Sequence, residues 1–351
     1  MANLTQTAYW TRRILKYGAI SIVAIIILRI TFNIIGSIWR TVNPPAPPPP
    51  TVLFGKLPKI TFPQNDSVNI KPTYRLETIQ GTLPKITNIA KVFFIPNEGP
   101  NLLGLEKATK QALKLGFQLE PQQVNERIYR WDNGLTPSTT LDIDINNNSF
   151  HQLYDYANDQ EAIASKDLPT NQQGAQEAKT FLSGNGFLAA DLATGSADFV
   201  YLKYLPPNLL PVTSLSEANF MRVNLFRADL DGLKILPPNP KNSLVSILFS
   251  GIKTMGRRII EVNYNYYPID RETFSTYPLK SVQTAWEEFQ KNQGFIANLG
   301  ENNKNEIIIR KVSLTYYDAD KPQHFLQPIY VFEGDRNFIG FLQAIDSKWT
   351  E

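Results

Sequence analysis

The chain has 351 residues, 42% apolar and 19% charged, which is the composition of a folded protein with a buried core. It contains no cysteine, which excludes disulfides, thiol catalysis and thiolate-bound metals. Of the 35 basic residues, five lie in the first 40 positions, which hold no acid, and the other 30 are matched by 32 acids. The rest of the chain is therefore near neutral, lacks the basic face that nucleic-acid binding needs, and predicts no nucleic-acid partner.

A long apolar run comes first. Residues 17–39 contain no acid and one base, and at a rise of ~1.5 Å per residue they are long enough to cross a hydrocarbon core of ~30 Å. We predict a cytoplasmic tail at 1–16 and a transmembrane helix at 17–39. Bases are concentrated before the run, so the positive-inside rule predicts an N-terminus in the cytoplasm and residues 41–351 outside.

Arg29 lies just past the middle of this span. A central arginine costs roughly 2.5–3.5 kcal/mol on insertion scales, and the isoleucines and leucines around it roughly offset that cost. Three interpretations stay open: Arg29 reaches back to the headgroups of a tilted anchor, it contacts a partner helix in the membrane, or the run is a cleaved signal peptide. The apolar pattern resumes after Arg29 and no small-x-small site follows Leu28, which argues against cleavage.

Prolines dominate the next segment, NPPAPPPP at 43–50. Proline neither continues a helix nor donates to a sheet and favours a polyproline II rod, so we predict a stiff spacer at 40–55. The motif LPKIT then occurs twice, at Leu57–Thr61 and Leu83–Thr87. Both copies are flanked by extended sequence, and we expect edge strands or extended arms there.

The remaining sequence predicts an α+β fold of three tandem modules, each a helix with an antiparallel sheet, at 56–156, 157–270 and 271–351. Apolar residues recur at helical spacing in each module, and the strands are apolar or alternating runs separated by turn residues. The expected helices are 100–116, 170–184 and 284–292. The expected strands are 91–96, 124–132, 139–146, 197–205, 220–230, 243–250, 257–267, 306–318, 324–334 and 337–346.

The last module resembles a known family. Its helix, its long strand closing in VSLTYYD (Val312–Asp318) and its hairpin into LQPIYVFEG (Leu326–Gly334) resemble the PepSY-type fold over 277–346. A short tail, one transmembrane helix and β-rich modules outside are also similar to the Yyc-type extracytoplasmic accessory regulators of Gram-positive cell-wall two-component systems. The resemblance implies a regulatory or inhibitory protein-contact role, and it carries no catalytic residue.

Two pairs of acidic residues are candidates for catalysis or metal binding. Asp142 and Asp144 lie two apart on an expected strand, either as a catalytic pair or, as we favour, on the solvent side opposite apolar residues. Asp318 and Asp320 stand at a hairpin, but a calcium loop there lacks the glycine and glutamate of an EF-hand. Nucleophile-elbow, P-loop and zinc-helix motifs are absent from the sequence, so we predict no enzyme activity, no cofactor and no metal site.

Three tyrosines form the candidate ligand platform. In EVNYNYYPID, Tyr264 and Tyr266 alternate with asparagines and Tyr267 follows. Aromatic rings beside amides stack on sugars, whereas alternating tyrosines also form half-buried sheet faces. We expect a non-enzymatic, single-pass cell-membrane protein in contact with the bilayer, whose extracytoplasmic part binds and modulates another envelope or membrane protein. The alternative is a cell-wall or glycan-binding module that uses these tyrosines.

Overall fold

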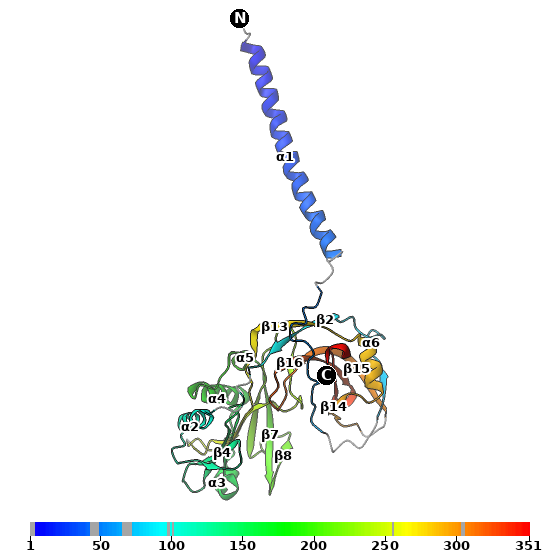
Figure 1. Cartoon of the computed structure of the whole chain (residues 1–351). Coiled ribbons are helices and arrows are strands. Elements are labelled where there is room, and N and C mark those ends of the chain that lie inside the picture. Colours follow the sequence, from blue (N-terminus) through cyan, green and yellow to red (C-terminus); the bar gives the residue numbers. More distant parts are fainter. Residues whose placement is uncertain are drawn as a thin grey trace. The chain divides into compact units, whose positions relative to one another are not determined.

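The computed structural model describes residues 4–42, 49–64, 72–96, 99, 102–254, 256–302 and 306–351, in two compact units that meet at Pro49 and Pro50. The first unit holds α1 (Leu4–Val42), one unbroken helix in Figure 1. Its stretch Ala8–Trp39 is long and apolar enough to cross a membrane. The helix also includes most of the tail predicted at 1–16, because residues 4–16 contain neither proline nor glycine. In the spacer predicted at 40–55, residues 40–42 belong to α1, and residues 43–48 lie outside the described residues.

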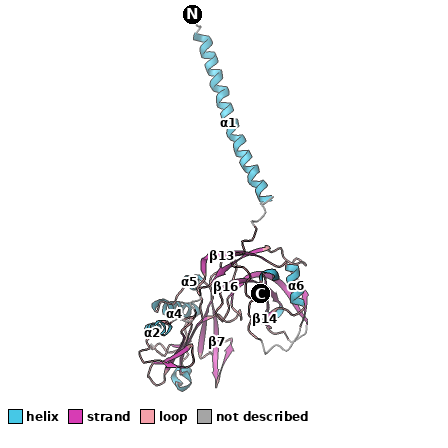
Figure 2. Cartoon of the chain, viewed as in Figure 1, coloured by secondary structure: helices cyan, strands magenta, loops and turns pink. Residues whose placement is uncertain are grey.

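The second unit, Pro50–Glu351, is a mixed α+β structure with two large sheets (Figures 1 and 2). The first sheet has nine strands in the order β3-β4-β5-β6-β12-β11-β9-β7-β8, and every neighbouring pair is antiparallel. Its strands are β3 (Gln122–Gln123), β4 (Ile128–Asp132), β5 (Thr139–Asp144), β6 (Phe150–Tyr154), β7 (Ala197–Leu205), β8 (Asn208–Val212), β9 (Phe220–Leu225), β11 (Val245–Ser250) and β12 (Ile259–Tyr264).

The second sheet has eight strands around the order β1-β15-β16-β17-β14, with β2 beside β16, β13 beside β2, and β10 beside β15. The antiparallel succession β15-β16-β17 confirms the three strands expected after the last helix. The strands are β1 (Thr73–Leu76), β2 (Ile89–Phe94), β10 (Ile235–Leu236), β13 (Asp270–Pro278), β14 (Phe295–Asn298), β15 (Glu306–Tyr317), β16 (Phe325–Gly334) and β17 (Phe338–Gln343).

Tandem PepSY-like repeats are not confirmed, because strands from different expected modules share sheets. Strand β6, from the segment 56–156, pairs with β12, from the segment 157–270. Strand β2, also from the first segment, pairs with β13 and β16 of the second sheet. An isolated hairpin leaves its edge N–H and C=O groups unpaired, and this cross-pairing satisfies them.

The three expected helices are confirmed as α2 (Gly104–Lys114), α4 (Asn171–Gly184) and α6 (Val282–Gln290). The start of α4 is fixed by a capping box, in which Thr170 accepts from the Gln173 N–H and the Gln173 side chain accepts from the Thr170 N–H. Short helical segments complete the unit: α3 (Gln160–Ala164), α5 (Ala190–Thr194), η1 (Tyr156–Asn158), η2 (Asp335–Asn337) and η3 (Ser347–Trp349).

Several strands differ from expectation for local reasons. The strand expected at 124–132 is interrupted, because Asn125 Oδ1 accepts hydrogen bonds from the Arg127 and Ile128 N–H groups, both at 2.9 Å, and closes a turn between β3 and β4. The strand expected at 220–230 ends at Leu225. Seven strands were not expected, namely β1, β3, β6, β8, β10, β13 and β14; β6 and β13 contain polar residues that interrupt their apolar patterns, and β3, β10 and β14 are only two to four residues long.

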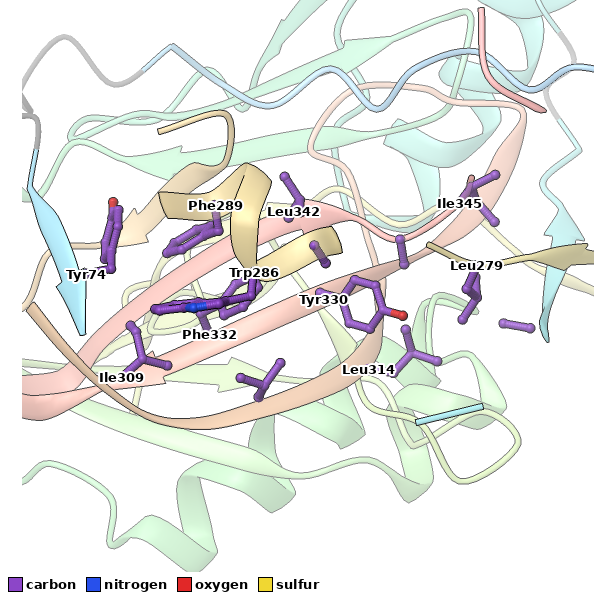
Figure 3. Packing of buried hydrophobic residues seen from close by; sticks show 14 of the residues in the cluster. Tyr74, Leu279, Trp286, Phe289, Ile309, Leu314, Tyr330, Phe332, Leu342 and Ile345 are labelled. Carbon is purple, nitrogen blue, oxygen red and sulfur yellow. The ribbon is translucent and has the colours of Figure 1, made fainter. Parts of the chain in front are cut away.

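The core of the second sheet lies beneath α6. Trp286 and Phe289 point from the helix toward the strands in Figure 3. The ring of Phe289 stacks on Phe332 with centroids 4.2 Å apart and also contacts Tyr74 at 4.6 Å. A Cβ at Gly340 would stand 2.3 Å from the Phe289 ring, so the sequence has glycine where α6 approaches β17.

The first LPKIT copy belongs to an extended arm that packs against the second sheet. Leu57 is fully buried and bridges to Thr350, and the Tyr277 hydroxyl donates to the Gly55 carbonyl at 2.9 Å. Further along, Phe62 stacks on Phe295 at 5.2 Å. The second copy, at 83–87, has no regular secondary structure. The arm therefore ties the start of the second unit to its C-terminal sheet.

Candidate functional site

The three candidate tyrosines take part in packing at the end of β12. Tyr264 stacks on Phe150 at 5.0 Å and donates to the Phe187 carbonyl at 3.0 Å. Tyr266 lies 6.0 Å from Tyr264 and donates to Asp191 at 2.8 Å, whereas Tyr267 is buried in a separate core cluster. Burial raises the pKa of all three phenols. The rings do not form one open surface, and ligand binding by them stays a prediction.

Tyr266 belongs to a buried ionic cluster that the sequence did not reveal. Arg227, 8% exposed, donates to Asp191 at 2.6 Å and to Asp318 at 3.3 Å, with its guanidinium 4.6 Å from the Tyr266 ring. Burial raises the pKa of Asp318, and the Arg227 charge opposes that rise. The cluster joins the segment after β9 to the end of β15. Arg227 stood inside an expected strand, so no sequence pattern singled it out.

The acidic pairs are engaged in structural contacts. Asp142 receives two hydrogen bonds of 2.6 Å from Arg130 on the neighbouring strand. Asp144 is buried, which corrects its expected place on the solvent side: it accepts from Arg127 and from backbone in the turn after β5. Asp318 pairs with Arg227, and no group of three or more His, Asp and Glu side chains that could hold a metal occurs within the described ranges.

Arg29 is exposed on α1, in the apolar stretch Ala8–Trp39. The structure gives its place in the helix, three turns from Trp39 by α-helical periodicity. Contact of Arg29 with a partner helix stays a prediction.

A groove of about 1070 Å³ lies on the nine-stranded sheet. Its lining comes from α4, the C-terminal end of α2, the β4–β5 loop, the segment between β11 and β12, and the strands. Its volume reaches the upper end of the ~300–1,000 Å³ typical of ligand pockets. We call it the α2–α4 groove, and it is lined by Lys114, Leu115, Gly116, Phe117, Asn133, Leu135, Thr139, Gln152, Gln172, Gln173, Gln176, Glu177, Thr180, Phe181, Asn185, Phe249, Lys253, Gly256, Arg258 and Ile259.

Helix packing and a helix end shape the groove. Ala112 of α2 and Ala178 of α4 belong to one core cluster with the strand residues beneath them, so both helices pack on the same face of the sheet. Helix α2 stops where Gly116 takes φ +92, a left-handed value that suits glycine. The Phe117 N–H then bonds the Ala112 carbonyl at 2.9 Å, and the Phe117 ring turns into the core.

The floor of the groove is apolar with one amide in it. Phe249 and Phe117 are 1% and 3% exposed, so their ring faces are covered by packing. Gln152 sits on β6 between Leu141 and Val262 of the neighbouring strands, both fully buried. Its Oε1 is buried and has no hydrogen-bond partner among the described residues. An unsatisfied buried acceptor in a ligand-sized groove marks a place where a ligand N–H would be stabilised.

Charges on the rim are mostly paired. Arg258 makes two 2.9 Å hydrogen bonds to Glu177 on α4, and Lys253 pairs with Asp167 at 2.6 Å and lowers the pKa of that carboxyl. Lys114, in the last turn of α2, is exposed and has no acidic partner within the described ranges. The rim thus offers one cation to a bound carboxylate.

Comparison with known proteins identifies no family. No family model matches the chain, and no curated protein matches it. A solved structure of an uncharacterized protein from Eubacterium rectale is similar with a TM-score of 0.41 and 15% identity, over 78% of this chain and 88% of that one. The Bacillus megaterium YpeB C-terminal domain is similar with a TM-score of 0.31 and 13% identity, over 72% and 96%. Similarity at this level carries no argument about family or function.

Proposed function

We propose that this protein is a single-pass membrane protein, with its N-terminus in the cytoplasm, whose extracytoplasmic unit binds a segment of another envelope protein and modulates it without catalysis. The observation that carries the proposal is the α2–α4 groove, which is large enough for a macromolecular segment and offers an acceptor and a cation that have no partner among the described residues. Helix α1 supports the membrane location, since Ala8–Trp39 is of spanning length and composition.

Topology can be tested directly because the chain has no cysteine. Ile79→Cys, at a fully exposed position of the second unit, is expected to react with a membrane-impermeant maleimide in intact cells. Ala8→Cys, in the tail that precedes the span predicted at 17–39, is expected to react only after permeabilisation. The reverse labelling pattern, or recovery of the chain free of membranes, would contradict the proposal.

The partner is tested in membranes with the full-length chain. A photo-crosslinking residue at Leu135, which is 67% exposed on the groove lip, is expected to form a discrete adduct with one envelope protein. The same residue at Leu210, exposed on β8 and outside the groove lining, is the matched control. Co-purification lost on Arg29→Leu would add a membrane contact to the groove contact. Equal adducts from both positions would argue against a specific partner.

Glycan binding is the second candidate, because several glutamine and asparagine amides line the groove and amides bond sugar hydroxyls. Its test is retention of the full-length chain, in detergent, on insoluble cell wall. Retention lost on Tyr264→Ala would favour the tyrosine platform, and retention lost on Leu135→Asp would favour the groove. Absence of retention would remove this candidate.

A further inference from the structure

We infer that the α2–α4 groove takes a particular class of ligand: an extended peptide segment with apolar side chains on one side and a carboxylate near one end. This inference rests on the proposed function and specifies the partner segment. Three features of the groove support it, namely a polar row along α4, an apolar floor with an unsatisfied acceptor, and the charge at the end of α2.

The polar row follows the axis of α4. Gln172, Gln176 and Thr180 recur every four residues and so lie on one face of the helix. At ~1.5 Å per residue the row extends for about 12 Å, the length of roughly four residues of extended chain at ~3.3 Å each. Gln176 Nε2 donates to Thr180 Oγ1 at 3.3 Å, which orients both side chains. Such a row can bond alternate backbone groups of a peptide lying along the helix.

The floor and lip suit apolar side chains. Leu135 stands 67% exposed on the lip, in a loop braced by Asn133, whose Oδ1 accepts from the Leu135 and Thr139 N–H groups at 3.2 and 2.9 Å. The loop is therefore organised without a ligand. Below it, the buried Oε1 of Gln152 accepts no hydrogen bond within the described ranges. A peptide N–H is a donor of the kind this oxygen needs.

The charge at the groove end selects a carboxylate. Of the three cations in the lining, Lys253 and Arg258 are each held by an acid, and Lys114 has no acidic partner among the described residues. Lys114 lies at the α2 end of the groove, and its flexible side chain can carry the charge to an acid of a ligand in the groove. One unpaired cation predicts one carboxylate and not a polyanion.

The rings of the groove favour a peptide over a glycan. Sugars stack on exposed aromatic faces, but Phe117 and Phe249 are buried to within a few per cent. Phe181 is half-buried and packs against the same core cluster. The groove contains no tyrosine or tryptophan among its lining residues. These aromatic rings therefore offer no open surface on which a sugar could stack.

The test uses the full-length chain in detergent micelles and a bead library of random octapeptides with free C-termini. Selected peptides are expected to carry apolar residues two positions apart and one acid at a fixed distance from them. By fluorescence anisotropy, Lys114→Glu is expected to raise the Kd of a selected peptide at least tenfold, and replacing the peptide acid by lysine is expected to restore binding. Lys110→Glu, one turn earlier and outside the groove lining, should change the Kd less than twofold.

Gln152→Met separates a binding role from a structural one. Removal of an unsatisfied buried amide should leave the melting temperature unchanged or raise it. If Gln152 bonds the ligand, the Kd of the selected peptide should nevertheless rise about fivefold or more. A Kd unaffected by both Lys114→Glu and Gln152→Met overturns the inference, as does competition by an N-acetylglucosamine tetramer.

Failure of the inference is distinguishable from failure of the proposed function. If the library yields no peptide while the Leu135 adduct with an envelope protein persists in Lys114→Glu, the peptide class is wrong and the proposed function stands. If wild-type chain gives no adduct in membranes, the proposed function falls and the inference falls with it.

Discussion

Replacing Arg227 by methionine tests the energetics of the buried cluster most directly. The guanidinium side chain is 5% exposed and bonds Asp191 at 2.6 Å, Asp318 at 3.3 Å and the Tyr267 carbonyl at 3.0 Å. Methionine fills much of the volume but leaves two buried carboxylates without a cation. Removing one partner of a buried pair costs about 3–5 kcal/mol, a large share of the ~5–15 kcal/mol of a typical domain.

The assay is denaturant-induced unfolding of the full-length chain in micelles, with Arg130→Met as the matched control. Arg130 bonds Asp142 twice at 2.6 Å but is 47% exposed, so its loss should cost less than about 1 kcal/mol. Both variants delete an arginine from a short ion pair, and burial is the main difference between them. Equal losses in the two variants would refute the reasoning.

The pH dependence gives a second check on the same variant. Burial raises the pKa of Asp318 above its ordinary 3.8, so in the wild type this group stabilises the fold below that value and the contribution is lost as pH rises through the folded pKa. Without Arg227 the opposing charge disappears and the folded pKa rises further. The deficit of Arg227→Met should therefore shrink as pH falls, and Asp318→Asn in that background should recover part of it at neutral pH.

Three further outcomes are expected. Burial alone would raise the pKa of Glu261, but the His151 hydrogen bond and the Arg222 charge lower it from 4.5 to about 2, so stability present above pH 4.5 is lost as the pH falls toward 2. In urea titrations, the free energy of unfolding lost between pH 5 and pH 2.5 should be about 2 kcal/mol larger in the wild type than in Glu261→Gln. Phe289→Ala should lower the free energy of unfolding by about 3–5 kcal/mol, measured by denaturant titration, and a loss under 1 kcal/mol would contradict the packing under α6. Gly340→Ala should cost about 1–3 kcal/mol by overpacking against the Phe289 ring, and calorimetry showing an unchanged melting temperature would count against that contact.

Local sequence determined the three long helices of the second unit and the strands β15, β16 and β17. Apolar spacing and a cap at Thr170 specify α4 whatever the rest of the chain does, because a helix satisfies its backbone from residues three or four positions away. The run Tyr17–Trp39 likewise indicates a spanning helix by composition alone. The strands β15, β16 and β17 are long and apolar enough to be recognised one by one.

Tertiary structure decided which strands are neighbours, and with that the candidate site. Nothing in the sequence of β6 indicates that it pairs with β12, more than a hundred residues later, because antiparallel pairing depends on edges that exist only after folding. The α2–α4 groove follows from that pairing, since it brings Gln152 under α4 and Lys114 to the groove end. Arg227 is a second example. Its charge is buried because Asp191 and Asp318, which are distant from each other in the sequence, both lie beside it in the fold, and residue spacing does not predict such a contact.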